Sequence, residues 1–208
     1  MPGRLHLLML VPMMTAGVVG TFCVLSVNSW MNNPSGFTMV NGQATDIDPW
    51  AAMFNDGVWL MFAHMWVGAY VLVGFVVAAV YAAGMLRGRR DRHHRMGFMV
   101  PFVFATVAAL SQPLVGHVLG LRVAETQPAK LAAFELAETT EQPAPLRLGG
   151  VMIDGEPRYS LDIPKIGSLI ARNSFDKPVP GLDSVPPADG PPATIVHLAF
   201  QSMVGIES

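Results

Sequence analysis

Residues 57–86 read GVWLMFAHMWVGAYVLVGFVVAAVYAAGML, thirty positions without an Asp, Glu, Lys or Arg. A helix rises by about 1.5 Å per residue, so this stretch is long enough to cross the roughly 30 Å of hydrocarbon in a bilayer. It contains one histidine, His64. Because ionisable groups at membrane depth are rare and usually functional, His64 is the first candidate for a site residue.

The composition indicates a helical membrane protein. Of 208 residues, 51% are hydrophobic and 13% are charged, and further apolar blocks occupy residues 5–27, 96–121 and a segment from about 193 onwards. We therefore predict an all-α membrane protein: a bundle of three complete transmembrane helices plus one truncated helix, with a large extracytoplasmic loop. Membrane lipid is an expected partner, and the net charge of −2 gives no indication of nucleic acid.

This prediction divides the chain into three parts. Residues 1–121 hold transmembrane helices 1–3 with their connectors, residues 122–192 form the loop, and residues 193–208 start the fourth helix. The connector 87–95 carries five arginines, which the positive-inside rule places in the cytoplasm. The loop follows the next helix and is therefore expected on the opposite, extracytoplasmic side.

The loop is long enough to have structure of its own. Residues 127–138 predict a short helix with Pro128 in its first turn. Residues 148–153 and 158–163, with Asp154-Gly155 between them, are typical of a hairpin. Residues 166–172 predict another short helix.

One nitrogen donor, His64, and one sulfur donor, Met203, are expected at matching depths in the membrane. His64 lies about seven residues from the outer start of its helix and Met203 about ten residues into the last block, so both reach roughly 10–15 Å below the outer boundary. Imidazole and thioether are a known axial pair for haem iron. From position alone, an interhelical hydrogen bond for His64 and ordinary packing for Met203, one of fourteen methionines, remain the alternatives.

The other five histidines are less suited to bind a metal, because solvation near helix ends or in the connector explains them. They are His6, His93, His94, His117 and His197. His197 is the best spare ligand candidate among them. However, it precedes Met203 by six residues, roughly 240° around a helix, so the two side chains cannot bind one iron from the same face of the helix.

Lys130 and Glu135 are the polar candidates of the loop. They stand five positions apart, about 140° around a helix axis, so they do not form an ion pair but can flank a bound molecule. A carboxylate can accept a quinol hydroxyl proton and release it outside, while a lysine can donate to the opposite oxygen. The alternative is two solvated charges on a surface helix.

Several short motifs together resemble subunit I of the cytochrome bd quinol oxidases. In chain order they are NSWMNNP at 28–34, FAH at 62–64, QPAKLAAFE at 127–135, RNS at 172–174, PGL at 180–182 and FQSM at 200–203. Each motif is weak alone. Their order, spacing and shared membrane side make the combination specific.

The resemblance implies that His64 and Met203 are the axial ligands of the low-spin haem b that receives electrons, and that Lys130 and Glu135 belong to the quinol-oxidising loop. It implies quinol as the substrate and a multi-pass location in the bacterial cytoplasmic (inner) membrane. The remainder of subunit I and a second oxidase subunit are the implied partners. The expected function is the electron-input part of a quinol:oxygen oxidoreductase of the aerobic respiratory chain.

Two departures from the family pattern matter. The oxygen-reducing centre of the family uses a histidine near the beginning of the protein and glutamates on other helices, and no matching residues occur here. The further haems are therefore not expected in this chain, nor is oxygen reduction by the chain alone. Some members carry an arginine two residues before the ligand methionine, where this chain has Gln201. The alternative function is a non-catalytic, truncated helical membrane protein without haem.

Overall fold

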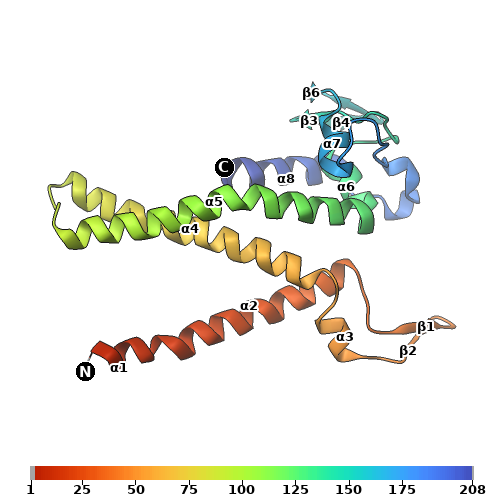
Figure 1. Ribbon diagram of the computed structural model, residues 1–208. Helices are drawn as coiled ribbons and strands as arrows, with labels where there is room; N and C mark the ends of the chain where they lie inside the picture. Colours follow the sequence, from red (N-terminus) through yellow and green to blue (C-terminus); the bar gives the residue numbers. More distant parts are fainter. Residues whose placement is uncertain (1–2, 208) are drawn as a thin grey trace. The chain divides into compact units, whose positions relative to one another are not determined.

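The computed structural model describes residues 3–207, and the described chain is mostly helical (Figure 1). It divides into two compact units, the first ending at Gly116 and the second beginning at His117. Within the described range, three helical segments are long and apolar enough to cross a membrane, and a shorter apolar helix follows: Gly3–Asn32, Pro49–Leu86, Arg92–Thr126 and, shorter, Ala193–Ile206. The predicted helical character and the three long apolar segments are therefore confirmed.

The first unit carries the apolar helices up to the middle of α5. Its elements are α1 (Gly3–Leu8), α2 (Leu10–Asn32), β1 (Thr38–Val40), β2 (Gln43–Thr45), α3 (Pro49–Met53), α4 (Val58–Leu86) and most of α5 (Arg92–Thr126). Helices α2 and α5 extend beyond their predicted apolar blocks, because helical hydrogen bonding continues into polar residues that an apolar criterion leaves out.

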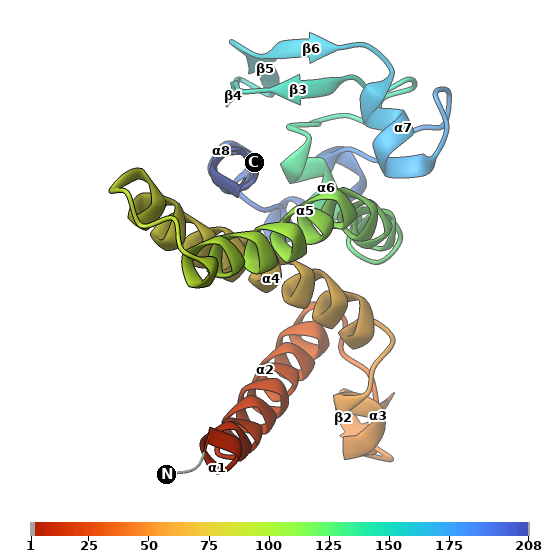
Figure 2. The ribbon, with the colours of Figure 1, turned by 60° about the vertical axis from the view of Figure 1, so that its left-hand side comes forward.

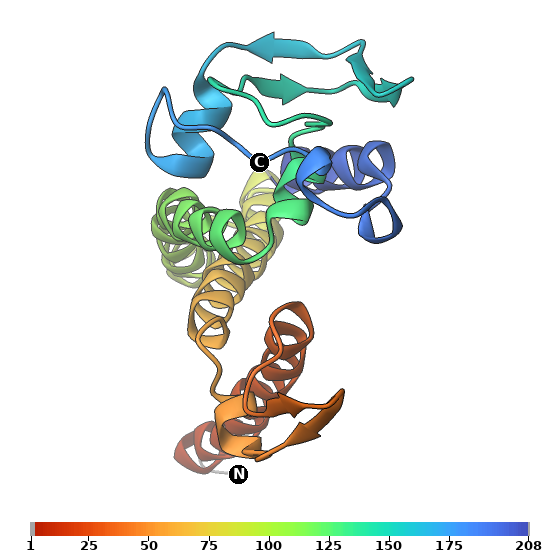
Figure 3. The same ribbon diagram turned by 90° about the vertical axis from the view of Figure 1, so that its right-hand side faces the viewer.

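The connection between α2 and α4 contains a two-stranded hairpin and the short helix α3 (Figure 3). Strands β1 and β2 pair antiparallel around Asn41 and Gly42, both with positive φ (53° and 79°), as the tightest hairpin turns require. Asp48 caps α3, because its carboxylate accepts hydrogen bonds from the backbone N–H groups of Trp50 (2.9 Å) and Ala51 (3.1 Å). Sequence-local interactions thus fix both elements.

A buried polar contact joins the end of α2 to the start of α4. The Ser29 hydroxyl donates to Oδ1 of Asn55 at 2.6 Å, and the same oxygen accepts from the backbone N–H of Gly57 at 3.1 Å. The Asn55 amide nitrogen donates to the carbonyl oxygen of Ala52 at 3.0 Å. Asn55 is buried and satisfied on both sides, so it holds the two long helices together at this end.

Helices α4 and α5 approach closely at a glycine. A Cβ on Gly74 would lie 2.7 Å from Cβ of Ala105 and 2.9 Å from the carbonyl oxygen of Pro101, so no side chain fits there. Next to this contact the rings of Phe75 and Phe102 meet edge to face, 5.9 Å between centroids. Small residues at such a crossing let two membrane helices pack backbone to backbone.

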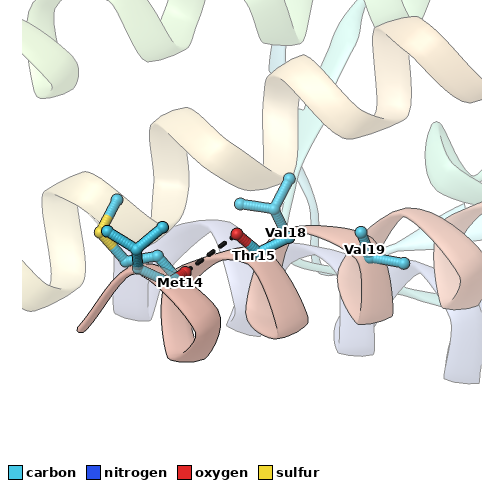
Figure 4. A pocket seen from close by; sticks show the side chains of 5 residues that line it. Met14, Thr15, Val18 and Val19 are labelled. Carbon is cyan, nitrogen blue, oxygen red and sulfur yellow. Dashed lines mark hydrogen bonds between the residues drawn. The ribbon is translucent and has the colours of Figure 1, made fainter. Parts of the chain in front are cut away.

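The outward faces of the long helices are apolar. The most apolar window of Gly3–Asn32 has no buried residue within the described structure. Along α2 a shallow hollow is lined by Val11, Met14, Thr15, Val18 and Val19 (Figure 4). The Thr15 hydroxyl donates to the carbonyl oxygen of Val11 at 2.9 Å, so this face presents little besides hydrocarbon, as contact with lipid or another apolar helix requires.

The second unit is built around the short helix α6. After the end of α5 it contains α6 (Pro128–Phe134), β3 (Leu146–Leu148), β4 (Val151–Ile153), β5 (Glu156–Arg158), β6 (Leu161–Ile163), α7 (Ile166–Arg172), η1 (Leu182–Ser184), η2 (Pro187–Asp189) and α8 (Ala193–Glu207). Helix α7 has the predicted bounds. Buried Leu131, Ala133 and Leu136 form the centre of the two small apolar clusters of this unit.

The predicted hairpin and its turn at Asp154-Gly155 are confirmed, but the predicted strand bounds are wrong, because the strands begin at Leu146 and Glu156 rather than at residues 148 and 158 and each is divided in two. Strand β3 pairs antiparallel with β6, and β4 with β5, so the four short strands form two ladders (Figure 2). The ladders are separated at Gly149 and Gly150, which have φ of 65° and 105°. The hairpin is therefore interrupted at this point, which leaves backbone groups available for other partners.

The predicted loop helix is shorter than expected. The expectation was residues 127–138, but α6 ends at Phe134, and Leu136 adopts a left-handed φ of 54°. The last four predicted positions are therefore wrong. Their apolar and acidic residues are compatible with a helix, but the N–H groups of Leu136 and Ala137 close α6 on the carbonyl oxygens of Ala133 (3.4 Å) and Ala132 (2.9 Å).

Candidate functional site

His64 lies on α4 and faces α5 within the first unit. It is half-buried, and the side-chain amide nitrogen of Gln112 lies 3.5 Å from each of its ring nitrogens and 3.4 Å from its carbonyl oxygen. One turn along α5, Gly116 leaves the ring edge open, since a Cβ there would lie 3.5 Å from Cε1 of His64. The imidazole is thus held by long contacts and keeps donor capacity.

Gln112 also has an atom without a partner. Its Oε1 is buried and makes no hydrogen bond within the described residues. The oxygen and nitrogen of a side-chain amide differ little in shape, so a half-turn of the amide would aim Oε1 at the His64 ring. An N–H of the imidazole could then donate to this oxygen, which is how a metal-binding histidine is usually oriented.

Met203 lies on α8 in the second unit and is 50% exposed. Among residues 3–207 there is no group of three or more His, Cys, Asp or Glu that could hold a metal ion. A haem iron needs no such group, because the macrocycle supplies four donors and the protein two. The imidazole of His64 and the thioether of Met203 fit that requirement chemically, and their pairing stays a prediction.

Lys130 lies in the middle of α6. Its Nζ donates to Oε1 of Gln127 at 3.2 Å and lies 5.9 Å from the centroid of the Phe134 ring. The side chain is half-buried, and this burial lowers the pKa of Lys130 below its usual range. A lysine in such a place remains a proton donor but holds its proton less tightly than an exposed one.

Glu135 follows α6 directly and is 9% exposed. Burial raises the pKa of this carboxyl group to about 7; the guanidinium of Arg147 acts in the opposite direction, and the carboxylate of Glu141 adds to the rise. Glu135 is therefore not a solvated surface charge. Both its protonated and its ionised forms are populated near neutral pH, as a proton-exchanging group requires.

Arg147 is a central residue of this region that the sequence reading missed. It lies on β3, is 5% exposed, and its Nη1 donates to the carbonyl oxygens of Glu135 (3.3 Å) and Leu136 (3.4 Å). Its Nη2 donates to Oε1 of Glu141 at 2.5 Å, and its Nε lies 3.7 Å from Asp162. The available signal was a lone arginine between two leucines, directly before a predicted strand; if the strand began earlier, alternation would point the arginine to the opposite face from the leucines.

His197 on α8 is fully buried, and both of its ring nitrogens face carbonyl oxygens. Nδ1 lies 2.5 Å from the oxygen of Phe134 and Nε2 lies 2.9 Å from that of Gly149. A neutral ring can donate one of these hydrogen bonds and an imidazolium both. Its explanation by interfacial solvation is therefore wrong, and in this arrangement neither nitrogen is available as a spare metal ligand.

Gln201, one turn after His197, holds the same interruption of the hairpin. Its amide nitrogen donates to the carbonyl oxygen of Arg147 at 2.5 Å, and its Oε1 accepts from the backbone N–H of Gly149 at 2.6 Å. The rings of Phe134 and Phe200 stack beside it at 4.2 Å. A neutral amide at position 201 thus connects α8 to the hairpin, which was not apparent from the sequence.

The part of α5 in the second unit is linked to the residues after α7. Nε2 of His117 lies 2.8 Å from Oδ1 of Asn173, which ends α7 in a left-handed conformation with φ of 50°. This asparagine belongs to the RNS motif at 172–174. The motif therefore has a structural role in attaching the loop to α5.

Comparison with known proteins gives consistent matches. The family described as cytochrome bd terminal oxidase subunit I matches residues 1–208. A Bacillus subtilis (strain 168) protein provisionally described as cytochrome bd menaquinol oxidase subunit I is 34% identical over 189 residues, 88% of this chain and 42% of that protein. The cytochrome bd ubiquinol oxidase subunit 1 of the same organism is 28% identical over 188 residues, 89% of this chain and 40% of that protein.

A solved structure agrees with these matches. The bd oxidase from Geobacillus thermodenitrificans superposes with a TM-score of 0.84 and 35% sequence identity, and the match covers 100% of this chain and 48% of that one. The chain thus spans less than half the length of each of these three proteins.

Proposed function

The chain belongs to the cytochrome bd terminal oxidase subunit I family, and from this we propose that it forms the electron-input part of a membrane-bound quinol:oxygen oxidoreductase. In this function the loop of residues 122–192 binds and oxidises a quinol, and the electrons pass to a low-spin haem b. The names of the relatives include a menaquinol and a ubiquinol oxidase, so the substrate class is a quinol. The buried Glu135, with its pKa of about 7, is the observation that carries the proposal.

Oxidation of a quinol to a quinone releases two electrons and two protons. Glu135 accepts the two hydroxyl protons one after the other, each time in its ionised form, and passes each to the outside solvent before the next, while the two electrons leave singly to the haem. A pKa near neutral allows Glu135 both to take up and to release each proton. Lys130, four positions before Phe134 on the same helix, donates a hydrogen bond to the opposite quinol oxygen. Its half-buried ammonium group and the neighbouring aromatic ring suit a flat, apolar head group with two polar ends.

The haem iron is assigned to His64 and Met203. A bound low-spin haem supplies one-electron transfer, and thioether ligation favours a potential high enough to accept electrons from quinol. With its side-chain amide rotated by a half-turn, Gln112 would orient the His64 ring through the buried amide oxygen that has no partner among the described residues. The protein groups therefore fix ligand orientation, while the long apolar helices keep water away.

The proposed location is the bacterial cytoplasmic (inner) membrane. Three long apolar helices support a multi-pass arrangement, with the arginine-rich connector 87–95 in the cytoplasm and the loop 122–192 on the extracytoplasmic side. The proposed partners are lipid, quinol, the remainder of subunit I and a second oxidase subunit. Oxygen reduction is assigned to those further parts.

The test uses the assembled oxidase containing this chain. In reduced-minus-oxidised spectra of membranes, His64→Ala should abolish the low-spin haem b signal and Met203→Leu should alter it. His93→Ala, which changes an exposed histidine of the connector, is the matched control. A normal haem b signal in His64→Ala would refute the ligand assignment and favour the haem-free alternative.

The quinol site is tested separately. Glu135→Gln should leave the haem spectrum intact and reduce quinol oxidation at saturating quinol by at least tenfold, in the lower range of a general-base contribution. Glu156→Gln, an exposed glutamate of the hairpin, is the control. Equal turnover of Glu135→Gln and wild type would remove Glu135 from the reaction.

A further inference from the structure

The turn that carries Glu135 has an unusual backbone. Leu136 is fully buried with φ of 54°, a left-handed conformation that side-chain-bearing residues rarely adopt. The end of α6 is closed locally, because the backbone N–H groups of Leu136 and Ala137 donate to the carbonyl oxygens of Ala133 (3.4 Å) and Ala132 (2.9 Å). The carbonyl oxygens of Glu135 and Leu136 lie beyond this closure and need a donor from another segment.

Arg147 supplies that support from the hairpin. Its Nη1 donates to both carbonyl oxygens of the turn, those of Glu135 and Leu136. A cation at the carboxyl end of a helix also interacts favourably with the helix dipole. The guanidinium is thus placed where it fixes the backbone of Glu135 and acts electrostatically on its side chain.

Glu141 balances the buried guanidinium. Its Oε1 accepts from Nη2 of Arg147 at 2.5 Å, while its Oε2 is buried and has no hydrogen-bond partner within the described residues. The backbone of Glu141 is itself held, because it exchanges two hydrogen bonds with Val179. An ion pair held this firmly keeps one positive and one negative charge beside Glu135 at fixed positions.

We propose that Arg147 positions the Glu135 carboxyl group within the quinol-oxidising loop, and that Glu141, by balancing the Arg147 charge, keeps that group able to exchange its proton. This inference rests on the proposed function of Glu135. Arg147 acts through Glu135 and is therefore a positioning residue. The charged and titratable groups around the turn are Lys130 on α6, Arg147 on β3, Glu141, Asp162 on β6 and His197 on α8.

The two members of the pair act in opposite directions. Without the guanidinium, Glu135 loses a positive neighbour, so its pKa rises and the carboxylate needed as a base is available only at higher pH. Without the Glu141 charge, Arg147 is unbalanced, so the pKa of Glu135 falls. Simple damage to the loop would instead lower activity at every pH.

The experiment measures quinol oxidation by the assembled oxidase as a function of pH, normalised to haem content. Arg147→Met should move the acidic limb of the profile to higher pH and Glu141→Gln to lower pH, each by about one pH unit. Arg147→Lys, which keeps the charge but not the paired donors, should shift the limb less than Arg147→Met. If Arg147→Met does not assemble, the pH profiles of Arg147→Lys and Glu141→Gln still test whether the two residues shift the acidic limb in opposite directions.

Arg158 and Glu156 provide the matched control. They form an exposed ion pair on the same hairpin, 3.3 Å apart, and neither Arg158→Met nor Glu156→Gln should move the profile. Shifts in the same direction, or unshifted profiles at normal haem content, would overturn the inference. If the Arg147 and Glu141 profiles are unshifted but Glu135→Gln abolishes turnover, the inference fails and the proposed function stands. Full turnover in Glu135→Gln would refute both the inference and the proposed role of Glu135.

Discussion

The side-chain amide of Gln201 on α8 donates a hydrogen bond to the carbonyl oxygen of Arg147 on β3 at 2.5 Å. Met203, the proposed haem ligand, lies two residues further along α8, and Arg147 holds the turn of Glu135. Within the second unit, the helix of the proposed electron acceptor and the turn of the proposed proton acceptor are therefore attached to the same strand. Quinol oxidation transfers both electrons and protons, so a change in β3 would affect the positions of both proposed acceptors.

His197→Ala should destabilise the second unit. A neutral ring donates to one of the two buried carbonyl oxygens, that of Phe134 or that of Gly149, so the variant leaves this oxygen unpaired at a cost of about 1–3 kcal/mol. Thermal inactivation of quinol oxidation by the assembled oxidase measures the effect. His93→Ala serves as the control, and equal thermal stability of the two variants would show that His197 does not hold α8.

Stability should depend on pH through Glu135. Its folded-state pKa of about 7 lies above the ordinary value of 4.5, so the stabilising contribution is fully present below about pH 4.5 and is lost as the pH rises through 7. Glu135→Gln should therefore be more stable than wild type at pH 8 by up to about 3 kcal/mol, and similar to it at pH 4.5. Melting temperatures across this range test the prediction. A pH-independent difference would contradict it.

Gln112→Leu should change the haem potential without removing the haem. If Oε1 of Gln112 accepts a hydrogen bond from His64, the imidazole is a stronger electron donor and stabilises the oxidised iron. Loss of the amide should then raise the midpoint potential in a redox titration. The neighbouring Ser111→Ala is the control, because its hydroxyl bonds only within the helix in the described structure. An unchanged potential in Gln112→Leu would leave the amide without this role.

Gly74→Ala should loosen the contact between α4 and α5. The new methyl group would meet Ala105 and Pro101 at 2.7 and 2.9 Å, and overpacking of this kind costs about 1–3 kcal/mol. Gly20→Ala on α2 is the matched control, because a Cβ there meets nothing within 4 Å. The thermal stability of the two variants in membranes compares them directly. Equal stability would mean that the helices move apart at no cost.

The sequence was sufficient for features set by local rules. The long apolar runs predict the helices, Asp154-Gly155 predicts the hairpin turn, and residues 166–172 predict α7, because each signal is contained within a few neighbouring residues. Glu135 and Lys130 were chosen from their place in a motif. Their burial and altered pKa values depend on residues far along the chain and were not predictable from α6 alone.

The early end of α6 shows the limit most clearly. Nothing in residues 135–138 forbids a helix, yet Leu136 is left-handed and the N–H of Ala137 closes the helix on the carbonyl oxygen of Ala132. Arg147, eleven positions after Leu136, binds the carbonyl group of Leu136 beyond this closure. His197 and Gln201 likewise looked like ordinary helix residues. Their partners are backbone atoms of other segments, and a sequence pattern does not reveal such partners.

The interruption of the hairpin at Gly149 has a consequence for any attempt to idealise this loop. In the described chain, the N–H and C=O of Gly149 make no hairpin hydrogen bonds and instead bind two side chains of α8, Gln201 and His197. If the ladder were redesigned as two continuous strands, the N–H and C=O of Gly149 would pair within the hairpin. The hairpin would become more regular, and α8 would lose these two contacts to it.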